Sequence, residues 1–160
     1  MSEWKTVKIG DICEQINGVS YKPVDVYDSL TDKATILLRA NNIFEDKLNY
    51  DELVFVDKKR VSENQYMKKG DILICRIGTL GKAIEIDINV DFSIFVSLGL
   101  IKPLDSYLSK YLVYVLNSGF GEKWIKKNKA GDAMHAAKIN LDVLRSFLVP
   151  LPPLLEQTRI

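Results

Sequence analysis

The hydrophobic periodicity of this chain changes near residue 103, and this change constrains its fold more than any other feature. Before that point the apolar residues come in short runs typical of strands, at 34–39, 53–56, 72–75 and 94–101. Beyond it, apolar side chains recur at the spacing of a helix, at residues 107, 108, 111, 112, 115 and 116. The chain therefore combines strands with helices.

The remaining segments predict short elements joined by polar turns. A helical spacing over 9–16 predicts a short amphipathic helix that ends at Asn17-Gly18. Alternation over 83–90 predicts a half-buried strand, and 20–33 reads as a long loop. Further short helices are expected at 62–66, 119–129, 141–145 and from 154 onward, with a last strand over 147–149 that Pro150 stops.

Length and composition predict one ordinary globular domain. A domain takes ~100–200 residues, and this chain has 160, of which 47% are hydrophobic and 27% charged. These values exclude a disordered tail, a collagen-like fibre and a disulfide-stapled miniprotein.

No secretory or membrane-spanning segment is visible. The longest apolar stretch, 93–101, is about half of the ~20 residues that cross a bilayer. We therefore expect a cytoplasmic protein that does not enter a membrane. Cys13 and Cys75 lie among apolar residues and are expected to be buried thiols. Two Cys and one His are too few for an ordinary zinc site, so no metal is expected.

Catalytic groups are scarce. His135 is the only histidine, so a small hydrolase would have to depend on it. The segment Gly78-Thr-Leu-Gly-Lys82-Ala83 has too few residues between its glycines for a phosphate loop and lacks the Ser or Thr that binds the metal. No glycine fingerprint for a dinucleotide or adenosylmethionine is present. We expect no catalytic residue and no cofactor.

The basic residues gather in two clusters, although 22 basic residues nearly balance 21 acidic ones. The first comprises Lys58, Lys59, Arg60, Lys68 and Lys69; the second comprises Lys123, Lys126, Lys127, Lys129 and Lys138. Tyr66 lies within the first cluster, and Phe120 and Trp124 accompany the second. Such patches suit contact with nucleic-acid phosphates. A solvated lysine surface is the alternative.

Two turns could contact DNA more specifically. Arginine pairs with guanine and asparagine with adenine in the major groove, so Arg39, Asn41 and Asn42 could read bases. The alternative is that both asparagines only form the turn. Arg76 and Lys82 flank the glycine turn and could hold a phosphate, or could be exposed cations of a tight hairpin.

The order of these segments resembles the target recognition domain of type I restriction–modification specificity subunits. The blocks that carry the resemblance are Trp4 with Val7-Lys-Ile-Gly-Asp-Ile-Cys13, then Leu38-Arg-Ala-Asn-Asn-Ile43, Gly70-Asp-Ile-Leu-Ile-Cys-Arg-Ile-Gly-Thr-Leu-Gly-Lys-Ala83, Tyr111-Leu-Val-Tyr-Val-Leu116 and Val149-Pro-Leu-Pro-Pro-Leu-Leu-Glu-Gln-Thr-Arg-Ile160. It covers essentially the whole chain.

The resemblance implies a mixed α+β fold: a twisted, mostly antiparallel sheet or partial barrel flanked by short helices, similar to the DNA-reading domain of adenine methyltransferases. It assigns 1–153 to the recognition domain and 154–160 to the start of a truncated helix. It implies that the chain reads one half of a split double-stranded DNA site. The partners would be methyltransferase subunits and, through them, restriction subunits. A protein-interaction module that docks partner helices is the alternative.

Position and chemistry then select the expected DNA contacts. They are the polar and basic residues of the loops and clusters above, namely Lys22, Arg39, Asn41, Asn42, Lys58, Lys59, Arg60, Lys68, Lys69, Arg76, Thr79, Lys82, Lys127, Lys129, His135 and Lys138.

Overall fold

A computed structural model of the chain describes residues 4–131 and 137–160. The strands are β1 (Lys5–Lys8), β2 (Cys13–Asn17), β3 (Val26–Tyr27), β4 (Ala34–Leu38), β5 (Ile43–Phe44), β6 (Lys47–Leu48), β7 (Val54–Asp57), β8 (Ile72–Cys75), β9 (Ala83–Glu85), β10 (Phe92–Ile94), β11 (Leu98–Pro103) and β12 (Leu148–Leu151). The helices are α1 (Ile9–Ile12), α2 (Leu108–Asn117), α3 (Gly119–Asn128), α4 (Leu141–Leu144) and α5 (Leu154–Gln157). Short 3-10 turns occur at Pro23–Asp25, Ala40–Asn42, Lys58–Arg60 and Glu63–Gln65.

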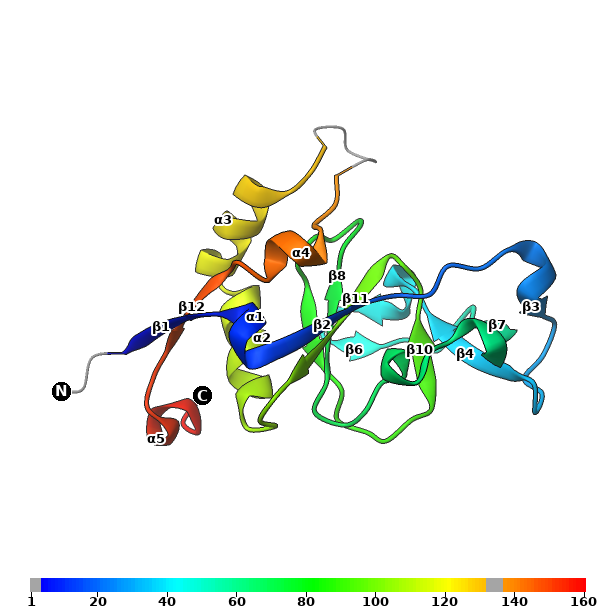
Figure 1. Cartoon of the computed structure of the whole chain (residues 1–160), viewed down its shortest axis with the longest axis horizontal. Coiled ribbons are helices and arrows are strands. Elements are labelled where there is room, and N and C mark those ends of the chain that lie inside the picture. The colour runs from blue at the N-terminus through cyan, green and yellow to red at the C-terminus, as the bar shows by residue number, and fades with distance from the viewer. Residues whose placement is uncertain (1–3, 132–136) are drawn as a thin grey trace.

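Among the described residues, the larger strands form two four-stranded sheets. One has the order β2-β11-β8-β9 and is antiparallel throughout; the other has the order β10-β4-β7-β3, in which only β10 and β4 are parallel. Figure 1 shows the first sheet in the middle of the molecule, with α2, α3 and α4 on one side and the second sheet on the other. The predicted mixed α+β fold with mostly antiparallel strands is confirmed.

The first sheet is buried on both faces, which explains the continuous apolar run of β8. Ile72 and Ile74 pack in the core beneath helix α2, whereas Leu73 and Cys75 face the second sheet. All four side chains are almost fully buried. Alternate side chains of a strand point to opposite faces, so a strand between two apolar layers must be apolar at every position.

The predicted strand over 94–101 is wrong, because the chain bends between Ile94 and Leu98. β10 joins the second sheet beside β4, and β11 joins the first sheet between β2 and β8. The N–H of Leu98 donates to the Phe95 carbonyl across this bend at 2.9 Å. The bend transfers the chain from one sheet to the other, and uniform hydrophobicity conceals it in the sequence.

Two other predicted elements are shorter than their sequence patterns. The helix predicted over 9–16 ends at Ile12, and Cys13–Asn17 pairs with β11 along its whole length. Pairing with a buried central strand outweighs the local helical spacing. The strand predicted over 83–90 stops at Glu85, where its pairing with β8 ends.

The two ends of the described chain pair with each other. β1 and β12 form an antiparallel ribbon in which Thr6 lies opposite Pro150, so the strand continues through a proline that was expected to stop it. The indole N–H of Trp4 also donates to Glu156 at 2.9 Å. The predicted helices over 107–117 and 119–129 are confirmed as α2 and α3. None of the helices in the described part is long and apolar enough to cross a membrane.

Candidate nucleic-acid interface

The turn after β4 separates its two asparagines into different environments. Asn42 is fully buried, and its Oδ1 accepts from the Arg39 N–H at 2.9 Å. Its Nδ2 donates to the carbonyls of Asn49 at 3.0 Å and Asp51 at 2.9 Å. All of these bonds shape the turn, which supports the turn-forming alternative for Asn42 and leaves its side chain inaccessible to a base. Asn41 is exposed beside it.

Arg39 is only partly free for the predicted base contact. Its side chain is partly buried, and Nη2 donates to the Glu52 carbonyl at 2.8 Å. Within the described part of the chain its Nε is buried without a hydrogen-bond partner, so only the terminal Nη groups of this guanidinium remain for a contact with a base.

The hairpin β5–β6 extends from this turn toward the glycine loop. Ile43 pairs with Leu48 and Phe44 with Lys47, and the Asn49 N–H donates to the Asn42 carbonyl at 2.7 Å. At the tip, Asp46 forms an ion pair with Lys82 at 2.6 Å. This pair connects the hairpin to the loop that follows β8.

The glycine loop is the tight connection that its sequence predicts. Gly78 and Gly81 have φ of 85° and 80°, a region that glycine adopts without strain. A Cβ on Gly81 would lie 2.2 Å from the Ile125 Cδ1 of helix α3. The loop is therefore pressed against α3 at one glycine and exposes Thr79 between the two.

A hollow of about 490 Å³ lies between the turn, the hairpin and the glycine loop. Its walls combine exposed polar groups with an apolar base: Ala40, Asn41, Ile43, Phe44, Glu45, Cys75, Ile77, Gly78, Thr79 and Lys82. We call this site the central hollow. It brings together Asn41, Thr79 and Lys82, three predicted site residues that come from two separate parts of the sequence.

Basic residues of the second cluster lie next to the central hollow. Lys138 pairs antiparallel with both Ile77 and Ala130, which places it and Lys129 alongside the glycine loop. Both lysines are exposed, as is Lys127 in the last turn of α3. His135, also predicted as a contact, lies outside the described residues.

Arg76 has a structural environment instead of the open phosphate-binding position that was predicted. Its Nε donates to the Ile139 carbonyl at 3.0 Å, and Nη1 donates to Asn17 Oδ1 at 3.1 Å and the Val96 carbonyl at 3.2 Å. Burial lowers the pKa of this guanidinium. The side chain ties β2, the β10–β11 bend and the segment before α4 to the end of β8.

A second group of predicted residues lies at the far end of the second sheet. Lys22, Lys58, Lys59 and Arg60 are all exposed there, and we call them the distal patch. Arg60 binds Asp25 at 2.9 Å, while the Lys22 N–H donates to the same carboxylate at 2.8 Å. These two partners hold the pKa of Asp25 below its ordinary value. The shared carboxylate joins the 20–33 loop to the Lys58–Arg60 turn. The predicted contacts of both segments therefore lie together.

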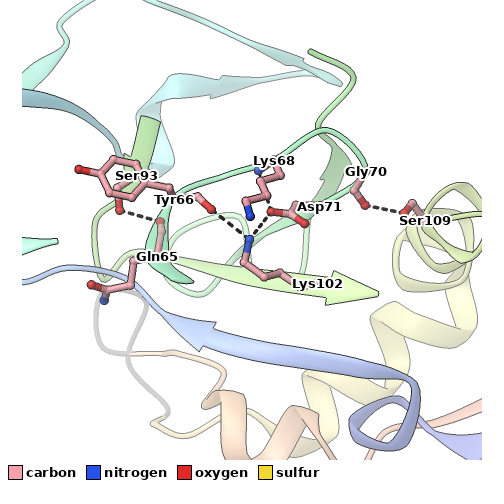
Figure 2. A network of polar contacts seen from close by, with 8 residues as sticks. All are labelled: Gln65, Tyr66, Lys68, Gly70, Asp71, Ser93, Lys102 and Ser109. Carbon is pink, nitrogen blue, oxygen red and sulfur yellow. Dashed lines mark hydrogen bonds and ion pairs between the residues drawn. The ribbon is translucent and has the colours of Figure 1, made fainter. Parts of the chain in front are cut away.

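Lys68 and Lys69 precede β8, whereas the glycine loop follows it. Lys69 nevertheless lines a neighbouring hollow of about 1020 Å³ together with Lys82, which also lines the central hollow. Figure 2 shows how their segment is held. Lys102 of β11 binds Asp71 at 2.6 Å and the Tyr66 carbonyl at 3.0 Å, and Ser93 of β10 donates to the Gln65 carbonyl at 2.8 Å. Among the described residues, the distal patch thus lies apart from the central hollow, whereas Lys69 borders a hollow next to it.

The hairpin β5–β6 was missed as a candidate element. Phe44 is 66% exposed at the rim of the central hollow. The sequence signal is weak, since only Ile43-Phe44 is β-prone and Glu45-Asp46 is not one of the residue pairs that favour a tight hairpin turn. The strands have only two residues each, so no element is predicted between the polar turn at 40–43 and the strand at 53–56.

The two thiols are not poised as nucleophiles. Both cysteines are buried and free, and burial raises the pKa of Cys13 to about 12 and that of Cys75 to about 11. The part of the chain that the structure describes also holds no group of three or more His, Cys, Asp or Glu side chains placed to bind a metal ion.

We expect both thiols to react with Ellman's reagent only as fast as the native chain opens. Their raised pKa values also predict a pH effect on stability. An unfolded thiol ionises near pH ~8.5, whereas the buried thiols keep their protons up to about pH 11–12. The free energy of unfolding is therefore highest below pH ~8.5 and falls as the pH rises toward about 11–12, because only the unfolded chain releases these protons. Urea unfolding at a series of alkaline pH values measures this loss. Rapid labelling of native protein at neutral pH would contradict the burial of the thiols.

Comparison with known proteins gives consistent matches along the chain. The family described as the type I restriction modification DNA specificity domain matches residues 1–160. The type I restriction enzyme EcoKI specificity subunit of Escherichia coli (strain K12) is 28% identical over 159 residues, which is 96% of this chain and 34% of that protein. The StySPI specificity subunit of Salmonella potsdam has the same identity and coverage.

Solved structures with low sequence identity share the fold. The HsdS subunit from Thermoanaerobacter tengcongensis superposes with a TM-score of 0.65 at 20% identity, over 98% of this chain and 35% of that one. The S subunit of a type I restriction-modification system from M. genitalium gives a TM-score of 0.56 at 16% identity, over 93% of this chain and 34% of that one. The chain spans about a third of the length of the relatives it matches.

Proposed function

This chain belongs to the type I restriction modification DNA specificity domain family, and from this premise we propose that it reads one half of a split double-stranded DNA site. The observation that carries the proposal is the central hollow within a chain that the family matches over residues 1–160. There an exposed asparagine and threonine from different segments share one rim, with exposed lysines beside it. The family and both curated relatives are named for specificity, in agreement with a non-catalytic role.

In this proposal the central hollow supplies sequence readout. Asn41 is exposed on a turn whose shape the buried Asn42 fixes, so its backbone position is held while its amide faces solvent. An asparagine amide pairs bidentately with adenine N6 and N7 in the major groove. Thr79 and the Nη1 group of Arg39 add further groups that bind base edges.

In the same proposal, phosphate contacts come from exposed basic residues beside the central hollow and in the distal patch. Lys129 and Lys138 flank the glycine loop, Lys127 extends the basic surface along α3, and the distal patch lies at the far end of the second sheet. Phosphate contacts position a protein on DNA without reading sequence. We therefore assign readout and anchoring to different groups of residues.

The partners follow from the family and stay part of the proposal. The chain corresponds to about a third of each relative. We propose that a specificity subunit carrying this domain directs methyltransferase subunits, and through them restriction subunits, to the site that the domain reads. This action would take place in the cytoplasm. We also propose that 1–153 forms the recognition unit and that 154–160 begins a helix that connects it to the rest of such a subunit.

Salt dependence tests DNA binding against the alternative of a protein-interaction module. We expect the 160-residue chain to bind a labelled pool of random duplexes at low salt, with an affinity that falls linearly on a log–log plot against salt concentration. Absence of binding at low salt, or an affinity indifferent to salt, would contradict the proposal.

The double variant Lys58→Ala/Lys59→Ala tests the distal patch. Each phosphate contact contributes ~0.9 to the salt slope, so we expect the slope to fall by roughly 1–2 while the preferred sequence stays the same. The matched control is Lys5→Ala/Lys8→Ala on β1, which lies at the opposite end of the molecule. An unchanged slope, or equal effects of the two double variants, would show that the distal patch does not touch DNA.

A further inference from the structure

Phe44 is a large aromatic side chain that the fold presents to solvent. It is 66% exposed on β5, next to Ile43, which packs against the core between the two sheets. Side chains alternate along a strand, so burying Ile43 forces Phe44 outward. The pairing of Phe44 with Lys47 fixes the direction in which the ring projects.

The hairpin that carries Phe44 is anchored at both ends. Asn42 binds its base through the N–H and carbonyl of Asn49, and the Asp46–Lys82 ion pair holds its tip against the glycine loop. The ring also lies on the rim of the central hollow together with Asn41. An exposed aromatic on an anchored hairpin beside a polar hollow suits a partner surface with both apolar and hydrogen-bonding parts.

The charges around the ring indicate which part of a duplex it meets. Glu45 at the hairpin tip would be repelled by phosphates, while the charge of Asp46 is paired with Lys82. The exposed Lys129 and Lys138 lie beside the glycine loop. This distribution places the tip toward base edges and the lysines toward the backbone. In the major groove, the apolar group among base edges is the thymine methyl, which phenylalanine contacts in protein–DNA complexes.

We infer that Phe44 is a specificity-determining residue that contacts the 5-methyl group of a thymine, in or next to the base pair whose adenine Asn41 reads. This inference rests on the proposed DNA-reading function and adds a residue and a base contact to it. The hollow then uses an amide for an adenine edge and a ring for a thymine methyl, both in the major groove.

Replacing thymine by uracil removes only the methyl group, which gives a sharp test. The DNA is the motif that the wild-type chain enriches from a random duplex library, with each thymine replaced in turn by deoxyuridine. We expect one position at which the wild type loses about fourfold in affinity, which corresponds to ~0.8 kcal/mol for one apolar carbon. The variant Phe44→Ala should bind thymine and uracil equally at that position, and Phe44→Leu should recover part of the discrimination.

The control variant is Tyr107→Ala, another exposed aromatic, which lies before α2 on the side of the molecule that holds Gly70. It should discriminate as the wild type does. An enriched motif without thymine, or one whose thymines are all replaceable without loss, would overturn the role of Phe44 and leave the proposed function intact. A Phe44→Ala variant that still discriminates would do the same. Failure to enrich any motif would overturn both.

Discussion

Replacing Lys102 by methionine is expected to lower the free energy of unfolding by about 3 kcal/mol. Lys102 and Asp71 form an ion pair in which the side chains are 17% and 10% exposed. Removal of one partner of a buried pair leaves the other charge without compensation, which costs ~3–5 kcal/mol when burial is complete. The residual exposure of this pair places the expected value at the lower end. Urea denaturation measures the change.

The exposed pair Lys82–Asp46 provides the matched control. Its N–O distance is the same 2.6 Å, but its side chains are 30% and 81% exposed. Pairs at the surface contribute only ~0–1 kcal/mol, so Lys82→Met should leave stability nearly unchanged. The double variant Lys102→Met/Asp71→Leu should recover much of the loss, because no buried charge then remains. Equal costs for Lys102→Met and Lys82→Met would contradict the role of burial.

Asn42→Ala is expected to cost about 2–3 kcal/mol of stability and to abolish sequence readout. The alanine would remove the acceptor of the Arg39 N–H and the donor to the carbonyls of Asn49 and Asp51. A buried polar group left without its partner costs ~1–3 kcal/mol, and water that enters the turn would satisfy part of this loss. Thermal or urea unfolding gives the stability, and DNA binding is compared at a temperature where the variant is folded.

The neighbouring variant Asn41→Ala is expected to behave in the opposite way. Its side chain is exposed, so stability should change by less than ~0.5 kcal/mol. Loss of a bidentate contact with adenine should lower the affinity for the preferred site by ~1–3 kcal/mol.

The contradicting outcome for the first of these two variants is also clear. A stable Asn42→Ala variant with normal readout would show that the turn does not depend on the Asn42 amide.

The sequence predicts the elements of the fold well where local signals are strong. Strand β4 ends at a polar turn, β8 is a continuous apolar run, and α2 has a long helical repeat; all three lie where predicted. The sequence fails to predict an element where pairing with another strand decides its structure. Cys13–Asn17 carries a helical spacing but pairs with β11, and the bend between Ile94 and Leu98 depends on which sheet each half joins.

The candidate site is less predictable because adjacent residues of one type face different directions. Nothing in the sequence separates Asn41 from Asn42, yet one is exposed and the other fully buried. Arg76 is predicted as a phosphate ligand from its place beside the glycine turn, but its side chain donates to groups in three other segments. Lys22 and Arg60 were assigned to separate segments, and the carboxylate of Asp25 joins them. Such assignments depend on contacts that are distant in the sequence.

In the proposed function, base readout resides in this chain and centres on Asn41. The most direct measurement incubates the wild type and Asn41→Ala separately with a random duplex library at low salt, followed by recovery and sequencing of the bound DNA. We expect one short enriched motif for the wild type, and the loss of preference at a single adenine position for Asn41→Ala. Binding by the wild type without enrichment, or the same motif from both proteins, would contradict it.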